Sequence, residues 1–274
     1  MADILADFTP ASMALAIEAN LFAFFHHLAN WPRVELHDAA DCCWTFSDLP
    51  FPLFNSVLRA RLDPEDADAL IEARIRACET RRVPMLWWTG PSSEPVDLSE
   101  RLQRHGFFLE PAHGMAADLE RPATEVWPDR SVTIESVRDR ETLETWSRVL
   151  CLAFGAPLPF GDAFAELALA IGLGDGSPFR HFLARVNGQA VATCSLFLGA
   201  GVAGIYDVAT LPDRRKRGLG GRVTRTAMHA ARASGYRMAI LHSSALGAGM
   251  YRMLGFRDVC PIGQHVWTPG PATP

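Results

Sequence analysis

The run of residues 212–221, with the sequence PDRRKRGLGG, constrains the fold of this chain more than any other segment. It lies between an apolar, strand-like stretch and a segment with the apolar spacing of an amphipathic helix, so it predicts a tight connection from a strand into a helix. Glycines allow the backbone to turn sharply and approach an anion, and the N–H groups that begin a helix carry partial positive charge. The run therefore predicts a cradle for a pyrophosphate group.

Neither standard nucleotide motif fits this run, because Gly218-x-Gly220-Gly221 is followed by Arg222 rather than by the residues of a Walker loop or a dinucleotide fingerprint. It matches the pattern Arg/Gln-x-x-Gly-x-Gly/Ala instead. Thirty-one residues after Gly220 comes a second motif, YRMLGF, at residues 251–256. The two motifs, in this order with a strand between them, resemble the acetyl-CoA loop and the end of the last helix in the GNAT superfamily of N-acetyltransferases.

The resemblance implies a binding site for acetyl-CoA as the acyl donor, with no metal. The loop and the start of its helix would hold the pyrophosphate, and the end of the preceding strand would pair with the pantetheine amides and polarise the thioester carbonyl. Ser244 stands where an asparagine is common, so that contact is expected to be altered. The expected donor-binding residues are Val208, Ala209, Thr210, Arg215, Lys216, Arg217, Gly218, Leu219, Gly220, Gly221 and Ser244.

Tyr251 is the expected catalytic residue. A phenol with an ordinary pKa of about 10 is protonated at neutral pH and can give a proton to a departing thiolate. The general base is less clear, because Gly204 stands where relatives carry a glutamate or histidine. Asp207, Tyr206 and a chain of water molecules are the alternatives.

The second half of the chain shows the order of strands and helices found in GNAT proteins. Residues 121–130 contain two prolines and no periodic apolar pattern, so they predict a connector before this domain. The expected elements are a strand at 132–137, helices at 141–154 and 162–171, strands at 179–186, 190–198 and 202–211, a helix at 219–234, a strand at 238–243, a short helix near 248–254 and a strand around 265–267.

The first half carries a weaker form of the same pattern. A strand-like segment at residues 85–88 is followed by a polar loop, a short helix and Gly106-Phe107, but Leu102 stands where the tyrosine is expected and no glycine cradle precedes the strand. The expected fold is mixed α/β with two GNAT-like domains in tandem, a degenerate one at 1–122 and a catalytic one at 131–268. An unrelated α/β cap is the alternative for the first half.

Composition and charge limit the kinds of partner that this chain is expected to bind. The net charge of −5 opposes binding to nucleic acid, which needs many basic contacts on one face. No segment is long and apolar enough to predict a membrane span, and the six cysteines show no zinc-binding spacing. We expect a cytoplasmic monomer or homodimer that acetylates a primary amine of a small molecule or peptide. A non-catalytic acyl-CoA-binding or regulatory protein is the alternative.

Overall fold

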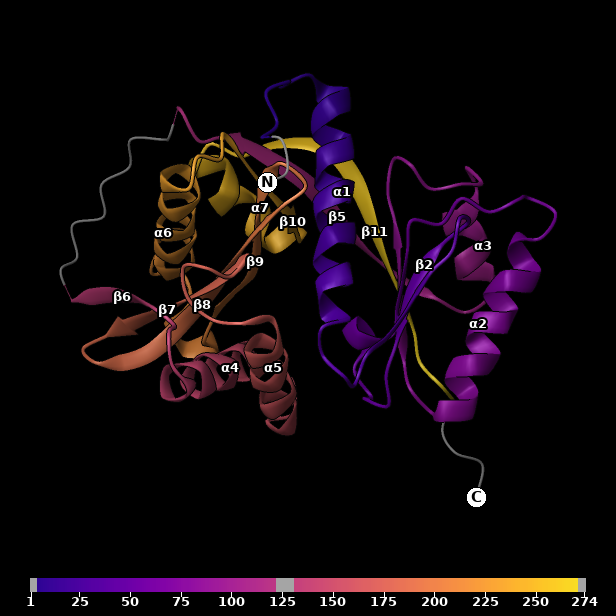
Figure 1. Cartoon of the computed structure of the whole chain (residues 1–274), viewed down its shortest axis with the longest axis horizontal. Helices are drawn as coiled ribbons and strands as arrows, with labels where there is room; N and C mark the ends of the chain where they lie inside the picture. Colours follow the sequence, from indigo (N-terminus) through magenta and orange to yellow (C-terminus); the bar gives the residue numbers. More distant parts are fainter. Residues whose placement is uncertain (1–3, 122–130, 271–274) are drawn as a thin grey trace. The chain divides into compact units, whose positions relative to one another are not determined.

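The computed structural model describes residues 4–121 and 131–270, which pack into two compact units (Figure 1). Unit 1 combines Met1–Phe24 with Gly114–Val259, and unit 2 combines Phe25–His113 with Cys260–Pro274. Each unit therefore takes segments from both halves of the sequence. The expected connector lies outside the described residues except for Arg121. The domain boundaries at 1–122 and 131–268 remain a prediction.

The sheet of unit 1 is mixed, and its strands follow the order β5-β10-β9-β8-β7-β6. Neighbouring strands from β6 to β9 are antiparallel, whereas β9 and β10 are parallel. Asn187 and Gly188 both have positive φ, which confirms the expected two-residue hairpin between β7 and β8. The strands are β5 (Phe108–Asp118), β6 (Val132–Ser136), β7 (Phe179–Val186), β8 (Gln189–Gly199), β9 (Val202–Thr210) and β10 (Met238–Ser243).

Helices α4, α5 and α6 of unit 1 bury the apolar faces that the sequence predicts. Asp139 caps α4 by accepting a hydrogen bond from the Thr142 N–H at 2.8 Å, and Gly155 ends that helix in the left-handed conformation. The apolar face of α6 packs Val223 and Ala227 into the core of the unit. The helices are α4 (Arg140–Phe154), α5 (Pro159–Ile171), α6 (Leu219–Ala233), α7 (Ala245–Met253) and most of α1 (Pro10–Leu28).

Two elements of the second half are longer than expected. Helix α7 begins at Ala245, directly after Ser244. The sequence did not indicate its first turn, because that turn is exposed and carries no apolar pattern; Leu246 is 87% exposed. The last strand, β11, runs over Arg257–Trp267, although Pro261 and Gly263 interrupt its alternation in the sequence. The other expected elements of this half are confirmed, with small differences at their ends.

The sheet of unit 2 is also mixed, with the order β1-β2-β3-β4-β11. Strands β3 and β4 are parallel, whereas β1 with β2, β2 with β3 and β4 with β11 are antiparallel. In the last of these pairs, residues 263–267 pair with residues 85–89 of the first half. Trp87 is fully buried beside Phe107. The elements are β1 (Glu35–Asp38), β2 (Cys43–Phe46), η1 (Pro52–Phe54), β3 (Ser56–Leu58), α2 (Ala67–Arg81), β4 (Met85–Thr89) and α3 (Leu98–Arg104).

Helix α1, with 19 residues, is the longest helix in the described part of the chain, and the sequence did not predict it as an element. Thr9 caps it by accepting a hydrogen bond from the Ser12 N–H at 3.4 Å, and Pro10 occupies its first turn. Glu18 and Asn20 interrupt its apolar run and are both buried. Among the residues that the structure describes, no helix is both long and apolar enough to cross a membrane.

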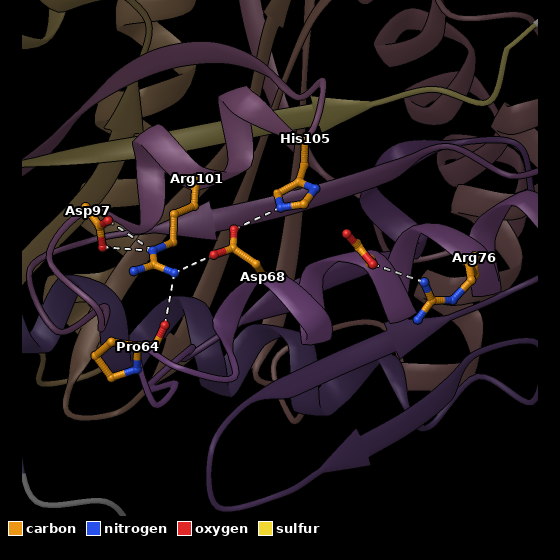
Figure 2. Close-up of polar contacts among 7 residues, drawn as sticks. Pro64, Asp68, Arg76, Asp97, Arg101 and His105 are labelled. Carbon is orange, nitrogen blue, oxygen red and sulfur yellow. Dashed lines mark hydrogen bonds and ion pairs between the residues drawn. The ribbon is translucent and has the colours of Figure 1, made fainter.

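A polar cluster joins α2 to α3 in unit 2 (Figure 2). The Asp68 carboxylate accepts a hydrogen bond from Arg101 Nη1 at 2.5 Å and lies 2.9 Å from His105 Nε2. Arg101, whose side chain is 16% exposed, also donates to Asp97 and to the Pro64 carbonyl. The hydrogen bond with His105 is the main cause that holds the pKa of Asp68 below its ordinary value. The cluster thus fixes the distance between α2 and α3, which contact each other over a short length.

We expect Asp68→Asn to lower the Tm by about 2–4 °C at pH 7, since the cluster is partly exposed. The pKa of Asp68 is lowered in the folded state, so its contribution is complete above the ordinary aspartate pKa of about 3.9 and is lost as the pH falls through the folded value. The difference between parent and variant should therefore shrink in acid.

Glu72→Gln is the matched control, because it breaks the exposed pair with Arg76 at 3.3 Å that Figure 2 also shows. Thermal unfolding followed by circular dichroism should give this variant the Tm of the parent. Equal Tm values for the Asp68 and Glu72 variants at pH 7 would contradict a stabilising role for the cluster.

Candidate functional site

The loop between β9 and α6 is held by Arg215. Its guanidinium donates through Nε to the Thr210 carbonyl at 3.2 Å and through Nη2 to the Ala153 carbonyl at 2.8 Å. Lys216 and Gly218 both adopt positive φ, which turns the chain into the first turn of α6. Arg215 is thus tied to backbone carbonyls of β9 and α4, while the neighbouring Lys216 and Arg217 are exposed.

The first turn of α6 presents backbone N–H groups beside the end of β9. The first helical hydrogen bond runs from the Arg222 N–H to the Gly218 carbonyl, so the N–H groups of residues 219–221 precede any intrahelical partner. A Cβ on Gly220 would lie 3.1 Å from Met250 Sδ and 3.7 Å from Thr210 Oγ1. Gly220 is therefore the point at which β9, α6 and α7 meet, and its missing side chain allows them to pack closely.

A β-bulge interrupts β9 just before this point. Ser195 pairs with Tyr206 and Thr193 with Ala209, so Asp207 and Val208 together face Cys194 on β8. Asp207 has a φ of 52°, and its carbonyl accepts a hydrogen bond from Thr193 Oγ1 at 2.8 Å. The parallel register of β9 with β10 ends at Gly204 and Ile240 within the described residues, so the backbone edge of residues 205–210 extends beyond that pairing.

Asp207 is an unusually basic carboxylate. Burial raises its pKa to about 6, against a smaller opposing effect from the Ser195 hydroxyl, which hydrogen-bonds to it. Ser195 Oγ also lies 2.7 Å from His181 Nδ1, and His181 is buried against Trp146 with a pKa lowered by burial to about 4. A neutral His181 donates from Nδ1 to the serine oxygen when the serine donates to Asp207. The carboxylate thus lies next to the buried pair of Ser195 and His181.

Tyr206, the other residue considered as a base, is held by α1. Its hydroxyl donates to Asn20 Oδ1 at 2.9 Å, and its ring stacks on Phe24 with centroids 4.7 Å apart. Burial, and to a lesser degree the Asp207 charge, raises the pKa of Tyr206 above its ordinary value. A tyrosine that stays protonated at neutral pH cannot act there as a base.

The same packing explains why position 204 carries glycine. A Cβ on Gly204 would collide with Asn20 Oδ1 and with the ring of Tyr206. Asn20 in turn donates from Nδ2 to the carbonyls of Gly199 and Val202. Sequence reasoning missed Asn20, because an asparagine inside an apolar run gives no signal of a partner almost two hundred residues away.

Tyr251 lies on α7 and is 8% exposed. Its ring packs edge-to-face on Phe256 with centroids 5.8 Å apart, and the hydroxyl makes no hydrogen bond within the described part of the chain. Burial, with a smaller contribution from Cys194, raises its pKa above the ordinary value. Cys194 faces Asp207 across the β9 bulge and lies in the same core cluster as Tyr251, so the two residues share one buried neighbour.

The remaining expected residues occupy different surroundings. Val208 is half-buried, and the side chain of Ala209 is buried with residues of α4 and α5, which leaves its backbone for any contact with a donor. Leu219 and Gly221 are buried in the first turn of α6. Ser244 is exposed, and its carbonyl accepts hydrogen bonds from α7.

Comparison with a family model identifies a segment that lies within unit 1. Residues 143–256 match the family model described as "Acetyltransferase (GNAT) family". A search among curated proteins found no match. The matched segment contains the β9 bulge, the α6 loop and Tyr251, and it ends at Phe256.

Solved structures extend the similarity of fold to nearly the whole chain. A GCN5-related N-acetyltransferase from Kribbella flavida is 19% identical with a TM-score of 0.69, over 92% of this chain and 96% of that one. One from Sphaerobacter thermophilus is 17% identical with a TM-score of 0.61, over 100% and 96%. A tandem GNAT protein from the clavulanic acid biosynthesis pathway is 13% identical with a TM-score of 0.59, over 100% and 99%. This chain therefore carries a GNAT-family acetyltransferase domain, and its fold is consistent with a tandem arrangement of two GNAT-like domains.

Proposed function

We propose that this protein is an acetyl-CoA-dependent N-acetyltransferase that moves an acetyl group directly to a primary amine of a small molecule or peptide. The observation that carries the proposal is the convergence of three features in the GNAT domain. Gly220 lies beside Thr210 and Met250, Asp207 faces Cys194 across the β9 bulge, and Tyr251 packs in the same core as Cys194. Together they supply an anion cradle, a proton acceptor and a proton donor.

Acetyl-CoA would supply the activated acetyl thioester. The N–H groups of residues 219–221 and the dipole of α6 would bind its pyrophosphate, with added positive charge from Lys216 and Arg217. Arg215 fixes the loop through the Thr210 and Ala153 carbonyls. The edge of β9 over residues 208–210 would pair with the pantetheine amides and direct an N–H at the thioester carbonyl, which stabilises the developing oxyanion.

Asp207 is the proposed base. An amine with a pKa near that of lysine, about 10.4, is mostly an ammonium ion at neutral pH and must lose a proton before it can attack. A carboxylate with a pKa of about 6 is a better acceptor than an ordinary aspartate and is still ionised at pH 7. Tyr251 is the proposed acid, since its raised pKa keeps the hydroxyl protonated until the thiolate leaves.

The test of this function is a thiol-release screen with acetyl-CoA against small amines and amine-terminated peptides. Amine-dependent release of CoA supports catalysis. Tight binding of CoA without release by any amine would favour the non-catalytic alternative. A cytoplasmic location and a monomeric or homodimeric state remain predictions from the sequence.

Asp207→Asn should lower kcat/KM by about 100- to 10,000-fold and remove the rise in rate that the parent shows as the pH passes about 6. The raised pKa of Asp207 makes its ionisation destabilising: this cost appears as the pH rises above about 3.9 and is complete above pH 6. The asparagine variant should therefore be at least as stable as the parent at pH 8, and asparagine tolerates the positive φ.

Ser195→Ala is the matched variant, because the Ser195 hydroxyl lowers the pKa of Asp207. The pH at which its rate rises should be higher than in the parent, and its activity at high pH should be retained. An unchanged pH dependence of the rate in both variants, at equal folding, would remove Asp207 from the mechanism.

Tyr251→Phe should leave CoA affinity close to that of the parent and lower kcat by about 100- to 10,000-fold, because a proton donor that acts only in the transition state does not contribute to ground-state binding. Calorimetry and steady-state kinetics with one accepted amine provide the two measurements. Tyr236→Phe, at a partly buried tyrosine that packs on the same core, is the control and should keep full activity. Parental turnover by the Tyr251 variant, with chemistry rate-limiting, would assign this tyrosine to packing alone.

A further inference from the structure

Three metal-ligating side chains gather in unit 2. His26 comes from the last turn of α1, Asp38 ends β1 and Cys43 begins β2. One donor atom from each lies within 4.8 Å of the other two, and His26 Nε2 lies 2.9 Å from Asp38 Oδ2. The β-hairpin register places Asp38 directly opposite Cys43. The cluster is therefore formed by local strand pairing and the end of one helix.

The hairpin backbone and Arg59 hold the carboxylate in place. The Ala39 N–H donates to the Cys42 carbonyl at 3.0 Å, which closes the turn between the two strands. Arg59 Nη2 donates to the Ala39 carbonyl at 2.7 Å and also bonds to Asp38 Oδ1. Because Oδ1 is occupied by Arg59, Oδ2 is the oxygen that faces His26. Outer partners of this kind orient the ligands of protein metal sites.

We propose that His26, Asp38 and Cys43 bind a Zn²⁺ ion. Imidazole nitrogen, carboxylate oxygen and thiolate sulfur are the donors that zinc prefers, and three protein donors leave one position of a four-coordinate ion for water. The Cys43 thiol releases its proton to solvent on binding, so thiolate and carboxylate together balance the charge of the ion. Arg59 remains paired with Oδ1.

The arrangement permits an ion to enter from solvent. His26 and Asp38 are exposed, whereas Cys43 is 1% exposed and lies at the buried side of the cluster. Tetrahedral zinc at about 2.0–2.3 Å from each donor needs donors about 3.3–3.8 Å apart. The widest separation must therefore close by at most about 1.5 Å, which side-chain rotation can provide. A bound ion would join the end of α1 to the hairpin.

Two of the proposed ligands have a neighbour of the same residue type, which provides a matched control. Tag-free full-length protein, reduced and freed of metal, is titrated with Co²⁺ alone, and the cobalt–thiolate absorption in the near ultraviolet is followed before displacement by Zn²⁺. We expect one Co²⁺ per chain with a thiolate band. His26→Asn and Cys43→Ser should each weaken binding by more than about 10-fold, and Cys43→Ser should abolish the band. His27→Asn and Cys42→Ser should bind as the parent does.

Circular dichroism establishes that each variant is folded, and His26→Asn, at an exposed position, keeps the test valid if Cys43→Ser does not fold. Absence of a thiolate band in the parent would overturn the proposal and leave His26 and Asp38 as a surface ion pair. Parental affinity in folded His26→Asn, or equal losses in the His27 or Cys42 variants, would also overturn it.

Discussion

The bulge in β9 is the constraint on which the rest of the site depends. Two residues, Asp207 and Val208, face the single Cys194, so the strand bends where its parallel pairing with β10 has already ended. The bend places the partly buried Asp207 opposite Cys194 and leaves a backbone edge that leads to the first turn of α6. Thr193, which donates to the Asp207 carbonyl, stabilises the bulge from the neighbouring strand. A regular strand would pair with both neighbours and offer neither feature.

In the proposed mechanism, burial affects the acid and the base in the same direction, because it raises the pKa of both groups. Removing a carboxyl or a phenol from water raises its pKa, which makes Asp207 a stronger base and keeps Tyr251 protonated. The Ser195 hydroxyl partly offsets the effect on Asp207, so that the carboxylate stays ionised at neutral pH. In unit 2 the helix after the corresponding strand, α2, is preceded by Asp63, Glu65 and Asp66, whose charges would repel a phosphate there. This acidic helix start supports the view that only one unit binds CoA.

The sequence was informative where function depends on local backbone pattern. Glycines in a short basic run predicted the turn into α6, and apolar spacing predicted the strands and helices of the second half, because both signals lie within a few residues. Long-range contacts gave no such signal. Three such contacts join distant segments: the hydrogen bond from Arg215 to Ala153, the hydrogen bond between Tyr206 and Asn20, and the pairing of β11 with β4. The raised pKa of Asp207 could not be predicted from the sequence either, because it follows from burial, which depends on long-range contacts. The group of His26, Asp38 and Cys43 depends on the hairpin register, and the sequence spacing showed no metal pattern.

We propose that the first turn of α6 holds the acyl donor, and calorimetric titration with CoA tests this assignment. Gly220→Asp places a carboxylate beside the helix N-terminus, Gly220→Asn adds nearly the same volume without charge, and Gly176→Asp adds the charge at an open position elsewhere. We expect one site per chain in the parent, a loss of more than about 100-fold in affinity for Gly220→Asp, a smaller loss for Gly220→Asn and none for Gly176→Asp. Parental affinity in Gly220→Asp, or two sites per chain, would contradict it.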